Sequence, residues 1–417
     1  MLKQIFPQQH IAFFNILDII KTQDFVEKKV VHNYTHIITM IKIKKENIKM
    51  KVVCDGLDLS IATAQVIKAI SSKTTNPVLE GIKLTAENDT LKLSATDLEL
   101  AIEKTIKADV KQEGETVIPG KFFSEFIKKL TDEKIELELN DKSKLKINYT
   151  DSESFIQCYN VLEFPNLNII ENGDSFTIKQ KDFKTLINKS IFSTALDDTR
   201  PVLKGCCFEI EENNINSIGL DGYRLAFVKK PLTKTTIKTS IIVPAKSLTE
   251  ICKFLEDNDE DITVYIQKNF LMVEFDNTKI ITRLIEGDFI NYKQIIPKDF
   301  TTSLTINKNV FEEAIERTSV LSRVDRNNLV KFDIKEKVLT LTSNSDIGNI
   351  KENIGISLKG NDLTIAFNSR YFSECLRTIS DEAIKINFNM PSSPCIVTPS
   401  DGDEYLYLIL PVRIINQ

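Results

Sequence analysis

The stretch RPVLKGCCFEIEENNINSIGLDGYRLAF, residues 200–227, decides the fold, because an earlier stretch of the chain repeats it. Residues 76–102, NPVLEGIKLTAENDTLKLSATDLELAI, have the same order of apolar and turn residues. Self-similarity at a fixed period indicates repeated structural units. Matching positions are 124 residues apart, as for Pro77 with Pro201 and for Asp97 with Asp221.

A second block of sequence extends the repeat to three copies. Residues 116–139 match residues 241–266, and the block recurs at residues 365–388. The third copy opens with residues 327–350, which have diverged further and carry Ser345 where the other copies carry an aspartate. The period is much longer than that of solenoid repeats, so each copy can bury a core of its own.

Each copy begins with a helical pattern, continues with strands that alternate at period two, and contains a second helix followed by more strands. The first helices are expected at residues 57–71, 179–192 and 307–322. This pattern predicts an α+β fold of three repeated domains, each with two helices and antiparallel sheets. The expected domains are residues 50–172, 173–297 and 298–417.

Residues 1–49 lie outside the repeat and carry eight Lys against four Asp or Glu. Two interpretations stay open for this extension. It is either a poorly ordered arm, or translation naturally begins at Met50, where a first strand is expected.

The composition is that of a water-soluble protein, with 42% hydrophobic and 27% charged residues and a net charge of −5. The most apolar stretch, residues 11–20, contains Asn15 and Asp18 and is shorter than the ~20 residues that a bilayer requires. It also lacks a secretory cleavage site. We therefore expect a cytoplasmic protein without membrane contact.

The chain lacks the usual catalytic and metal-binding patterns. All three histidines precede Met50, and the seven cysteines include no Cys-x-x-Cys pair. Residues 114–123 faintly resemble a phosphate-binding loop, but the spacing is one residue too long and Phe122 replaces the required Ser or Thr. The sequence thus predicts no catalytic residue, no metal and no cofactor.

Six motifs give the chain from Met50 onward a resemblance to a known family. It is similar to the bacterial DNA polymerase III β subunits, the β sliding clamps. Two positions depart from the family's usual residues, Tyr223 where histidine is frequent and Ile290 where proline is frequent. The matching motifs are TRPVLKG (199–205), LDGYRLA (220–226), EGDFINYKQIIP (286–297), FNSRYFSECL (367–376), SSPCIVTP (392–399) and YLILPVR (407–413).

The resemblance implies a non-catalytic processivity factor in DNA replication. Two chains would join head to tail into a homodimeric ring around duplex DNA, with helices inside and sheets outside. Because the joined surfaces differ, the contact closes only if the rotation per subunit completes a circle. The replicative polymerase, the clamp loader and repair proteins would bind the ring through short linear motifs.

The distribution of charge agrees with such a ring. The helical windows 57–73, 121–130, 179–193, 246–256, 307–323 and 369–379 contain sixteen Lys or Arg and nine Asp or Glu, a surplus of seven positive charges. Since the whole chain carries −5, the remainder carries −12. A weakly basic lining suits a ring that slides without reading bases. The residues predicted to face DNA are Lys73, Lys128, Lys184, Lys189, Arg200, Lys253, Arg323 and Arg377.

The resemblance also places a partner-peptide pocket beside LDGYRLA and the C-terminal YLILPVR. Apolar side chains would form the cleft and polar ones would orient the peptide. The Asp221-Gly222 turn would then reverse the chain and present one wall of the pocket. The predicted pocket residues are Leu203, Leu220, Gly222, Tyr223, Arg224, Leu225, Pro244, Leu248, Phe289, Asn368, Tyr371, Ser393, Leu408, Ile409, Leu410, Pro411, Val412 and Arg413.

Two alternatives remain at this point. The chain could be a three-domain enzyme that uses Asp97, Asp221 or Glu286 as acid or base. A repeated turn aspartate is better explained by hydrogen bonds from its side chain to the backbone. A scaffold that does not bind DNA is the second alternative, and the segregation of charge argues against it.

Overall fold

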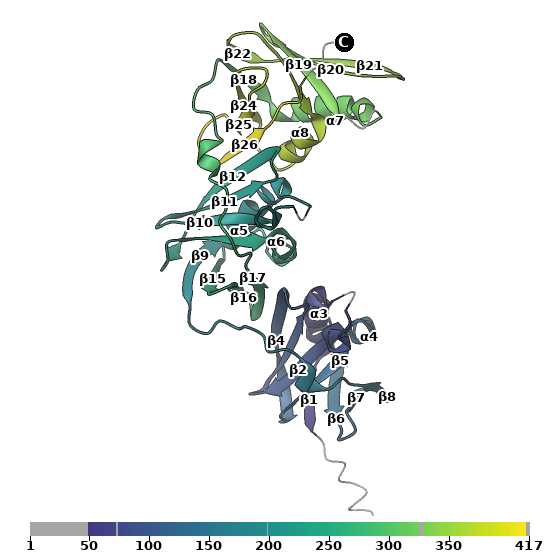
Figure 1. Cartoon of the computed structure of the whole chain (residues 1–417). Coiled ribbons are helices and arrows are strands. Elements are labelled where there is room, and N and C mark those ends of the chain that lie inside the picture. Colours follow the sequence, from purple (N-terminus) through teal and green to yellow (C-terminus); the bar gives the residue numbers. More distant parts are fainter. Residues whose placement is uncertain (1–48, 72–73, 198, 325–327, 414–417) are drawn as a thin grey trace, which may run out of the picture.

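One order of elements occurs three times in the computed structural model, which describes residues 49–71, 74–197, 199–324 and 328–413 (Figure 1). The two interpretations of the N-terminal extension fall on residues outside this part of the chain. In each unit a strand and a helix precede three strands, an edge strand leads into a second helix, and three more strands follow. The predicted α+β fold with three repeated units is confirmed.

The first unit begins at Met50 and pairs all of its strands antiparallel. Its elements are β1 (Met50–Asp55), α3 (Gly56–Val66), β2 (Gly81–Glu87), β3 (Thr90–Thr96), β4 (Leu100–Gln112), β5 (Gly114–Pro119), α4 (Gly120–Ile127), β6 (Lys134–Leu139), β7 (Lys144–Tyr149) and β8 (Ser152–Gln157).

The second unit repeats this order and adds the short strand β13. Its elements are β9 (Asp174–Lys179), α5 (Gln180–Asn188), β10 (Gly205–Ile210), β11 (Asn214–Leu220), β12 (Arg224–Pro231), β13 (Lys234–Thr235), β14 (Thr239–Pro244), α6 (Ala245–Cys252), β15 (Asp261–Gln267), β16 (Phe270–Phe275) and β17 (Thr278–Arg283).

The third unit adds the short strand β22. Its elements are β18 (Thr302–Asn307), α7 (Lys308–Ser322), β19 (Leu329–Lys335), β20 (Val338–Ser345), β21 (Gly348–Gly355), β22 (Ser357–Gly360), β23 (Leu363–Asn368), α8 (Ser369–Leu376), β24 (Ala383–Phe388), β25 (Cys395–Pro399) and β26 (Tyr405–Ile409).

The first helix of each unit lies close to its predicted place. α7 matches its window nearly residue for residue, whereas α3 and α5 end earlier and are followed by the 3-10 turns 67–69 and 191–193. Side-chain caps fix two of the three starts: Asp55 accepts from the backbone N–H of Leu57 and Asp58, and Asn307 accepts from Val310.

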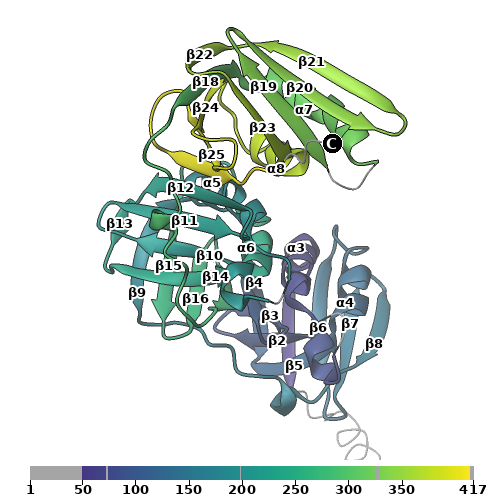
Figure 2. The ribbon, with the colours of Figure 1, turned by 45° about the horizontal axis from the view of Figure 1, so that its top comes forward.

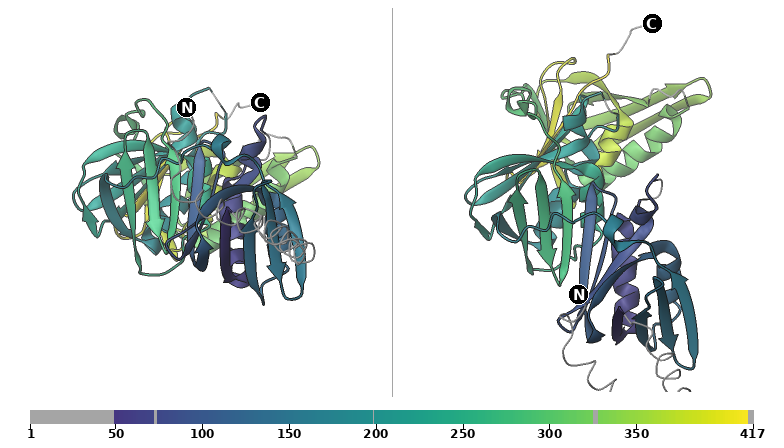
Figure 3. Two further views of the ribbon diagram at one scale, coloured as in Figure 1. Left: turned by 90° about the horizontal axis from the view of Figure 1, so that it is seen from below. Right: turned by 60° about the horizontal axis from the view of Figure 1, so that its bottom comes forward.

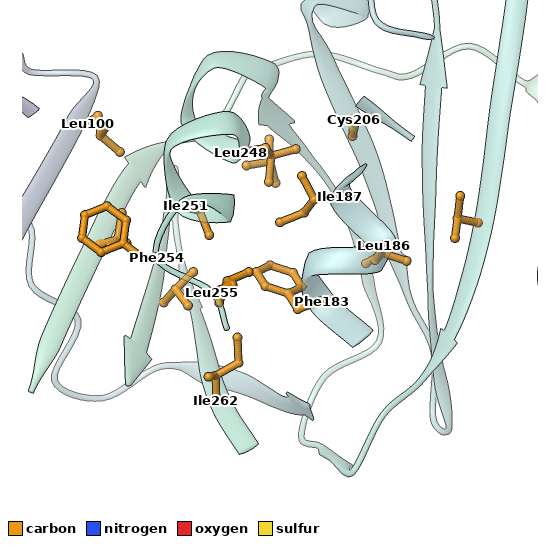
Figure 4. Close-up of a cluster of buried hydrophobic side chains, with 14 of the residues drawn as sticks. Leu100, Phe183, Leu186, Ile187, Cys206, Leu248, Ile251, Phe254, Leu255 and Ile262 are labelled. Carbon is orange, nitrogen blue, oxygen red and sulfur yellow. The ribbon is translucent and has the colours of Figure 1, made fainter. Parts of the chain in front are cut away.

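The two helices of each unit cover one face of its sheets and bury their apolar sides there. In the second unit, Phe183 and Ile187 of α5 point toward Leu248 and Ile251 of α6, and all four side chains are fully buried (Figure 4). Burying side chains of this size stabilises a fold by ~1.5–3 kcal/mol each. Buried apolar side chains of all three units belong to one core cluster beneath these helices.

Two strand pairs join the three units into one body. β4 of the first unit pairs with β17 of the second, and β12 of the second unit pairs with β26 of the third. The resulting sheets have 13 and 9 strands within the described residues, and a further 4-stranded sheet holds β19 to β21 and β23.

The units follow one another along a curved body. Figure 2 and the right-hand view of Figure 3 place the first and third units on either side of the second, so that the chain forms a crescent. Helices α3, α6 and α8 lie toward its concave side, and β8 and β21 lie toward its two ends (Figure 2). No helix in the described part of the chain is both long enough and apolar enough to span a membrane.

Candidate functional site

The Asp221-Gly222 turn connects β11 to β12, as expected. The carboxylate of Asp221 accepts hydrogen bonds from the backbone N–H of Tyr223 (2.8 Å) and Arg224 (3.0 Å). Gly222 has φ +92°, and nothing lies within 4 Å of the position that a side chain would take. The predicted side-chain-to-backbone turn is confirmed, and its outer surface is open.

Alternate residues of β11 and β12 face away from the helices and form a second apolar cluster. We name this group the outer apolar cluster; Val202, Phe289, Leu406 and Leu410 pack partly buried around it. Six predicted pocket residues, Leu203, Leu220, Leu225, Phe289, Leu408 and Leu410, thus lie together. The buried members are Leu203, Cys207, Ile218, Leu220, Leu225, Tyr292, Ile396 and Leu408.

Two predicted pocket residues, Leu248 and Ile409, face the other side of the sheet. Both side chains are buried in the main core, and Leu248 points from α6 into that core (Figure 4). Pro244 ends β14 opposite Gly205 and is half-buried. On the outer face, Leu225 and Leu408 are also buried, whereas Leu410 keeps part of its surface exposed.

Arg224 is almost entirely withdrawn from solvent, at 7% exposure, and joins the second unit to the third. Its Nε donates to Asp221 Oδ2 at 3.0 Å, and its terminal nitrogens donate to Glu374 and to the carbonyl of Phe192. The guanidinium carbon lies 4.8 Å from the centre of the Tyr371 ring. These contacts hold in place the β11–β12 turn, which was predicted to form one wall of the pocket.

The charge network around Arg224 fixes the ionisation of Glu374. Burial alone would raise the pKa of Glu374, but hydrogen bonds from Arg370 and Arg224 outweigh it, and the pKa lies below the ordinary 4.5. Burial, with Asp221 next to the ring, raises the pKa of Tyr371. Glu374 is therefore ionised and Tyr371 neutral at neutral pH.

The exposed surface of this wall is formed by the side chain of Tyr223. Its side chain is 61% exposed and stacks on Tyr371, with ring centres 6.1 Å apart and planes inclined by 20°. Its backbone carbonyl accepts from the N–H of Leu410 at 2.9 Å, which attaches the C-terminal segment to the turn. The motifs LDGYRLA (220–226) and YLILPVR (407–413) are thus neighbours in space.

The remaining predicted pocket residues have other contacts. Asn368 caps α8 through Arg370 N–H, and Ser393 donates its backbone N–H to the carbonyl of Met390. Pro411 and Val412 are half-buried and Arg413 is exposed.

The residues predicted to face DNA differ in how far their side chains are exposed. The side chains that are exposed belong to Lys128, Arg200, Lys253, Arg323 and Arg377, whereas Lys184 is half-buried. Lys189 lies 4.6 Å from the centre of the Tyr405 ring in the third unit, and burial lowers its pKa. Lys73 lies outside the described residues.

Sequence reasoning missed Glu374, although a signal for it existed. The repeat carries glutamate at the same place in all three copies, as Glu125, Glu250 and Glu374. Phe192 and Tyr292 were also missed. Tyr292 covers Phe227 and donates its hydroxyl to Glu209 at 2.9 Å.

No cluster of three or more His, Cys, Asp or Glu side chains that could hold a metal occurs among residues 49–71, 74–197, 199–324 and 328–413. Six cysteines are buried as free thiols and Cys252 is partly exposed. In Asp97 and in Asp221, one carboxylate oxygen accepts hydrogen bonds from two backbone N–H groups.

Comparison with known proteins gives consistent results. The family described as DNA polymerase III beta subunit matches with its N-terminal domain at residues 50–168, its central domain at 177–291 and its C-terminal domain at 293–413. The beta sliding clamp of Halalkalibacterium halodurans is 32% identical over 362 residues, which cover 84% of this chain and 95% of the relative. That of Staphylococcus epidermidis is 32% identical over 357 residues, covering 83% and 95%.

Solved structures agree. The crystal structure of the DNA polymerase sliding clamp from Bacillus subtilis has a TM-score of 0.86 and 30% identity, and covers 88% of this chain and all of its own. A putative DNA polymerase III beta subunit from Eubacterium rectale has a TM-score of 0.84, 32% identity and the same coverage.

Proposed function

Because the chain belongs to the family of DNA polymerase III beta subunits, the bacterial sliding clamps, we propose that two copies close head to tail into a ring around duplex DNA. Membership confirms the resemblance predicted from the sequence. The chain is a DNA sliding clamp and a non-catalytic processivity factor, so the alternatives of a carboxylate enzyme and of a scaffold without DNA are wrong.

The observation that supports the ring is that the two junctions within the chain are built in the same way, from equivalent strands. β4 and β12 occupy equivalent places in their units, as do β17 and β26. In the first junction Leu100–Lys104 pair with Thr278–Thr282, and in the second Arg224–Val228 pair with Tyr405–Ile409. Each junction contains five residue pairs in antiparallel register.

Among the residues that the structure describes, two strands that correspond to the junction strands have one unpaired edge each. β21, the third unit's counterpart of β4 and β12, pairs there with β20 alone, and β8, the first unit's counterpart of β17 and β26, pairs there with β7 alone. An open strand edge is a template for another strand. A third junction therefore requires β21 of one chain and β8 of another, and applying it twice completes a closed ring.

The register of the first junction predicts the pairs of the third. Gly348 would lie opposite Ile156 of the second chain, and Lys351 opposite Glu153. This charge pair repeats Glu103 opposite Lys279 in the first junction. Exposed apolar side chains near the two ends would be covered on closure, namely Phe155 at 57%, Val320 at 67% and Ile347 at 74% exposure.

The concave side of the crescent would face DNA. The helices on that side present exposed cations, which attract phosphates without reading bases. Several of these cations already have partners, as Lys253 has Glu250 (2.7 Å) and Arg377 has Glu316 (3.3 Å). Partly neutralised cations suit a ring that is held by encirclement and must move.

The outer apolar cluster and the wall at Tyr223 would receive short linear motifs from the replicative polymerase, the clamp loader and repair proteins. Apolar anchors would pack on the partly buried residues around the cluster, Val202, Phe289 and Leu410. The exposed Tyr223–Tyr371 ring pair would contact the remainder of the peptide.

The proposal is tested by topology. After loading onto a nicked circular DNA, the protein should elute with the DNA in gel filtration, and linearising the same DNA should release it. Equal retention on both forms, or a stable monomer at micromolar concentration in sedimentation equilibrium, would overturn the ring.

A further inference from the structure

The second helices of the three units, α4, α6 and α8, carry basic residues at the same two places of the repeat. Each of these helices packs beside the first helix of its unit, and all six basic side chains are exposed. The repeat therefore offers three versions of one cationic surface, which can be compared place by place. The six residues are Lys121 and Lys128 in the first unit, Lys246 and Lys253 in the second, and Arg370 and Arg377 in the third.

In the second unit, both cations lie beside a carboxylate. The Nζ atom of Lys246 is 2.8 Å from Asp97 Oδ2 of the first unit, so this pair crosses the first junction. The Nζ atom of Lys253 is 2.7 Å from Glu250 Oε1, which lies one turn earlier along α6. The positive charge at both places is thus offset by a neighbouring acid.

In the third unit, both cations are also paired. Arg370 Nε lies 2.7 Å from Glu374 Oε1, and a terminal nitrogen of Arg377 lies 3.3 Å from Glu316 Oε1 on α7. Exposed pairs of this kind add little to stability. They still matter for a charged ligand, because the carboxylate stays near the cation and repels an approaching phosphate.

In the first unit, the two cations have no such partner. Within the part of the chain that the structure describes, neither Lys121 nor Lys128 takes part in an ion pair. The next residue, Lys129, is also exposed and unpaired there, and its counterparts Phe254 and Thr378 are uncharged. Helix α4 and the residues directly after it therefore present three lysines that no carboxylate of the described chain contacts.

The net charge of the three surfaces differs accordingly. Residues 121–130, with Glu125 included, carry a surplus of two positive charges, whereas residues 246–255 and 370–379 carry one each. The ion pairs that α6 and α8 form with other elements cancel these two single charges. The surplus at α4 remains.

Two changes within the repeat account for the missing partners. Ala64 occupies the place on α3 that Glu316 occupies on α7, counted from the start of each helix. Ser345 occupies the place in the third unit that Asp97 occupies in the first, and the proposed ring would bring this turn to α4 of the second chain. The next residue, Asp346, lies at the exposed tip of the turn. Both places that supply a carboxylate elsewhere thus lack one here.

We propose that α4 makes the main phosphate contacts of the second helices, through Lys121, Lys128 and Lys129, and that α6 and α8 contribute little. This inference rests on the proposed ring around DNA. A phosphate that approaches α4 meets cations without a paired acid and displaces their counterions, whereas at α6 and α8 the cations are already neutralised. Because α4 corresponds to α6, whose Lys246 reaches across the first junction, the two α4 helices of a ring would stand at its two seams.

The test is the salt dependence of binding to a short linear duplex, measured with the full chain by fluorescence anisotropy of labelled DNA. Each phosphate contact releases counterions and contributes about 0.9 to the slope of the logarithm of the binding constant against the logarithm of the salt concentration. The double variant Lys121→Gln, Lys128→Gln should therefore lower this slope by about 2.

The matched control is the double variant Lys246→Gln, Lys253→Gln, which removes the same charge from the equivalent places of α6. Its slope should fall by less than about 0.5, because carboxylates offset these lysines before DNA arrives. All four lysines are exposed, so both double variants should keep the urea midpoint of the wild type.

Equal slopes for the two double variants, or a larger loss in the control, would overturn the proposal. This outcome is separate from that of the ring. A wild-type chain that is retained on nicked circular DNA but shows equal slopes in the two variants would overturn this inference alone. A chain that leaves circular and linear DNA equally would overturn the ring, whatever the slopes.

Discussion

The turns at Asp97 and Asp221 occupy the same place in the first and second units, yet they hold the next unit in different ways. At the first junction the free oxygen of Asp97 accepts from Lys246 of the second unit at 2.8 Å, and the lysine side chain is 74% exposed. At the second junction the free oxygen of Asp221 binds Arg224, whose side chain is 8% exposed.

This difference shows how one repeated junction acquires a second task. An exposed lysine pair is screened by water and adds little. A buried arginine with two carboxylates must keep all its partners, since any charge left unpaired inside is costly. The second junction therefore holds Tyr371 and Tyr223 in fixed positions, where the proposed peptide surface needs them.

The largest expected effect comes from removing the buried cation. Arg224→Ala leaves Asp221 and Glu374 without their shared partner and should lower the free energy of unfolding by about 3–5 kcal/mol. The measurement is urea unfolding of the full chain. Lys246→Ala at the first junction is the control and should cost less than about 1 kcal/mol. Equal losses in the two variants would contradict the comparison.

The same junction should respond to acid. The pKa of Glu374 is lowered in the folded chain, so its contribution to stability is complete above the ordinary value of 4.5 and is lost as the pH falls through the folded pKa. Unfolding of the wild type and of Glu374→Gln should therefore differ most at neutral pH and converge in acid. A constant difference across this range would show that Glu374 does not contribute through its charge.

The third junction extends the comparison to two chains. Lys351→Glu would place like charges opposite Glu153 in both seams of the ring, and the dimer dissociation constant should rise about tenfold. The additional change Glu153→Lys should restore it. Sedimentation equilibrium measures both variants. A dimer that is unaffected by the single change would refute the proposed register.

The smallest effect concerns the backbone of the turns. Leu98 has φ +78° at the place where the second unit has Gly222. A side chain in this conformation costs about 1–2 kcal/mol, of which glycine's greater freedom in the unfolded chain offsets part. Leu98→Gly should raise the free energy of unfolding by about 0.5 kcal/mol, and Gly222→Ala should lower it by about 1 kcal/mol. Thermal unfolding of both variants tests the signs.

Much of the fold follows from the sequence because the repeat aligns elements of equal role. The helices, the α+β class and the turns at Asp97 and Asp221 depend on local patterns, and local patterns are visible in a sequence. The strained Leu98 is not, since nothing in its neighbours demands a positive φ.

The site was predicted less completely, because its contacts join residues far apart in the chain. Glu374 lies 150 positions from Arg224, and although this glutamate recurs in all three copies of the repeat, nothing in the sequence indicates that it pairs with Arg224. Leu248 and Ile409 are apolar like the members of the outer apolar cluster, but Leu248 lies on α6 inside the main core, and the register of β26 turns Ile409 to the same side. Lys189 was placed among the DNA-facing residues by its helix, yet its ring contact is with Tyr405.

The strand pairs that connect the units also determine where the assembled protein can yield. A bend between two units of one chain would have to break a row of backbone hydrogen bonds and stretch the covalent link beside it. The proposed seam between chains would have a similar row of bonds but no such link. Mechanical strain that spreads the ring should therefore part the seams first, and each crescent should move as a single rigid arm.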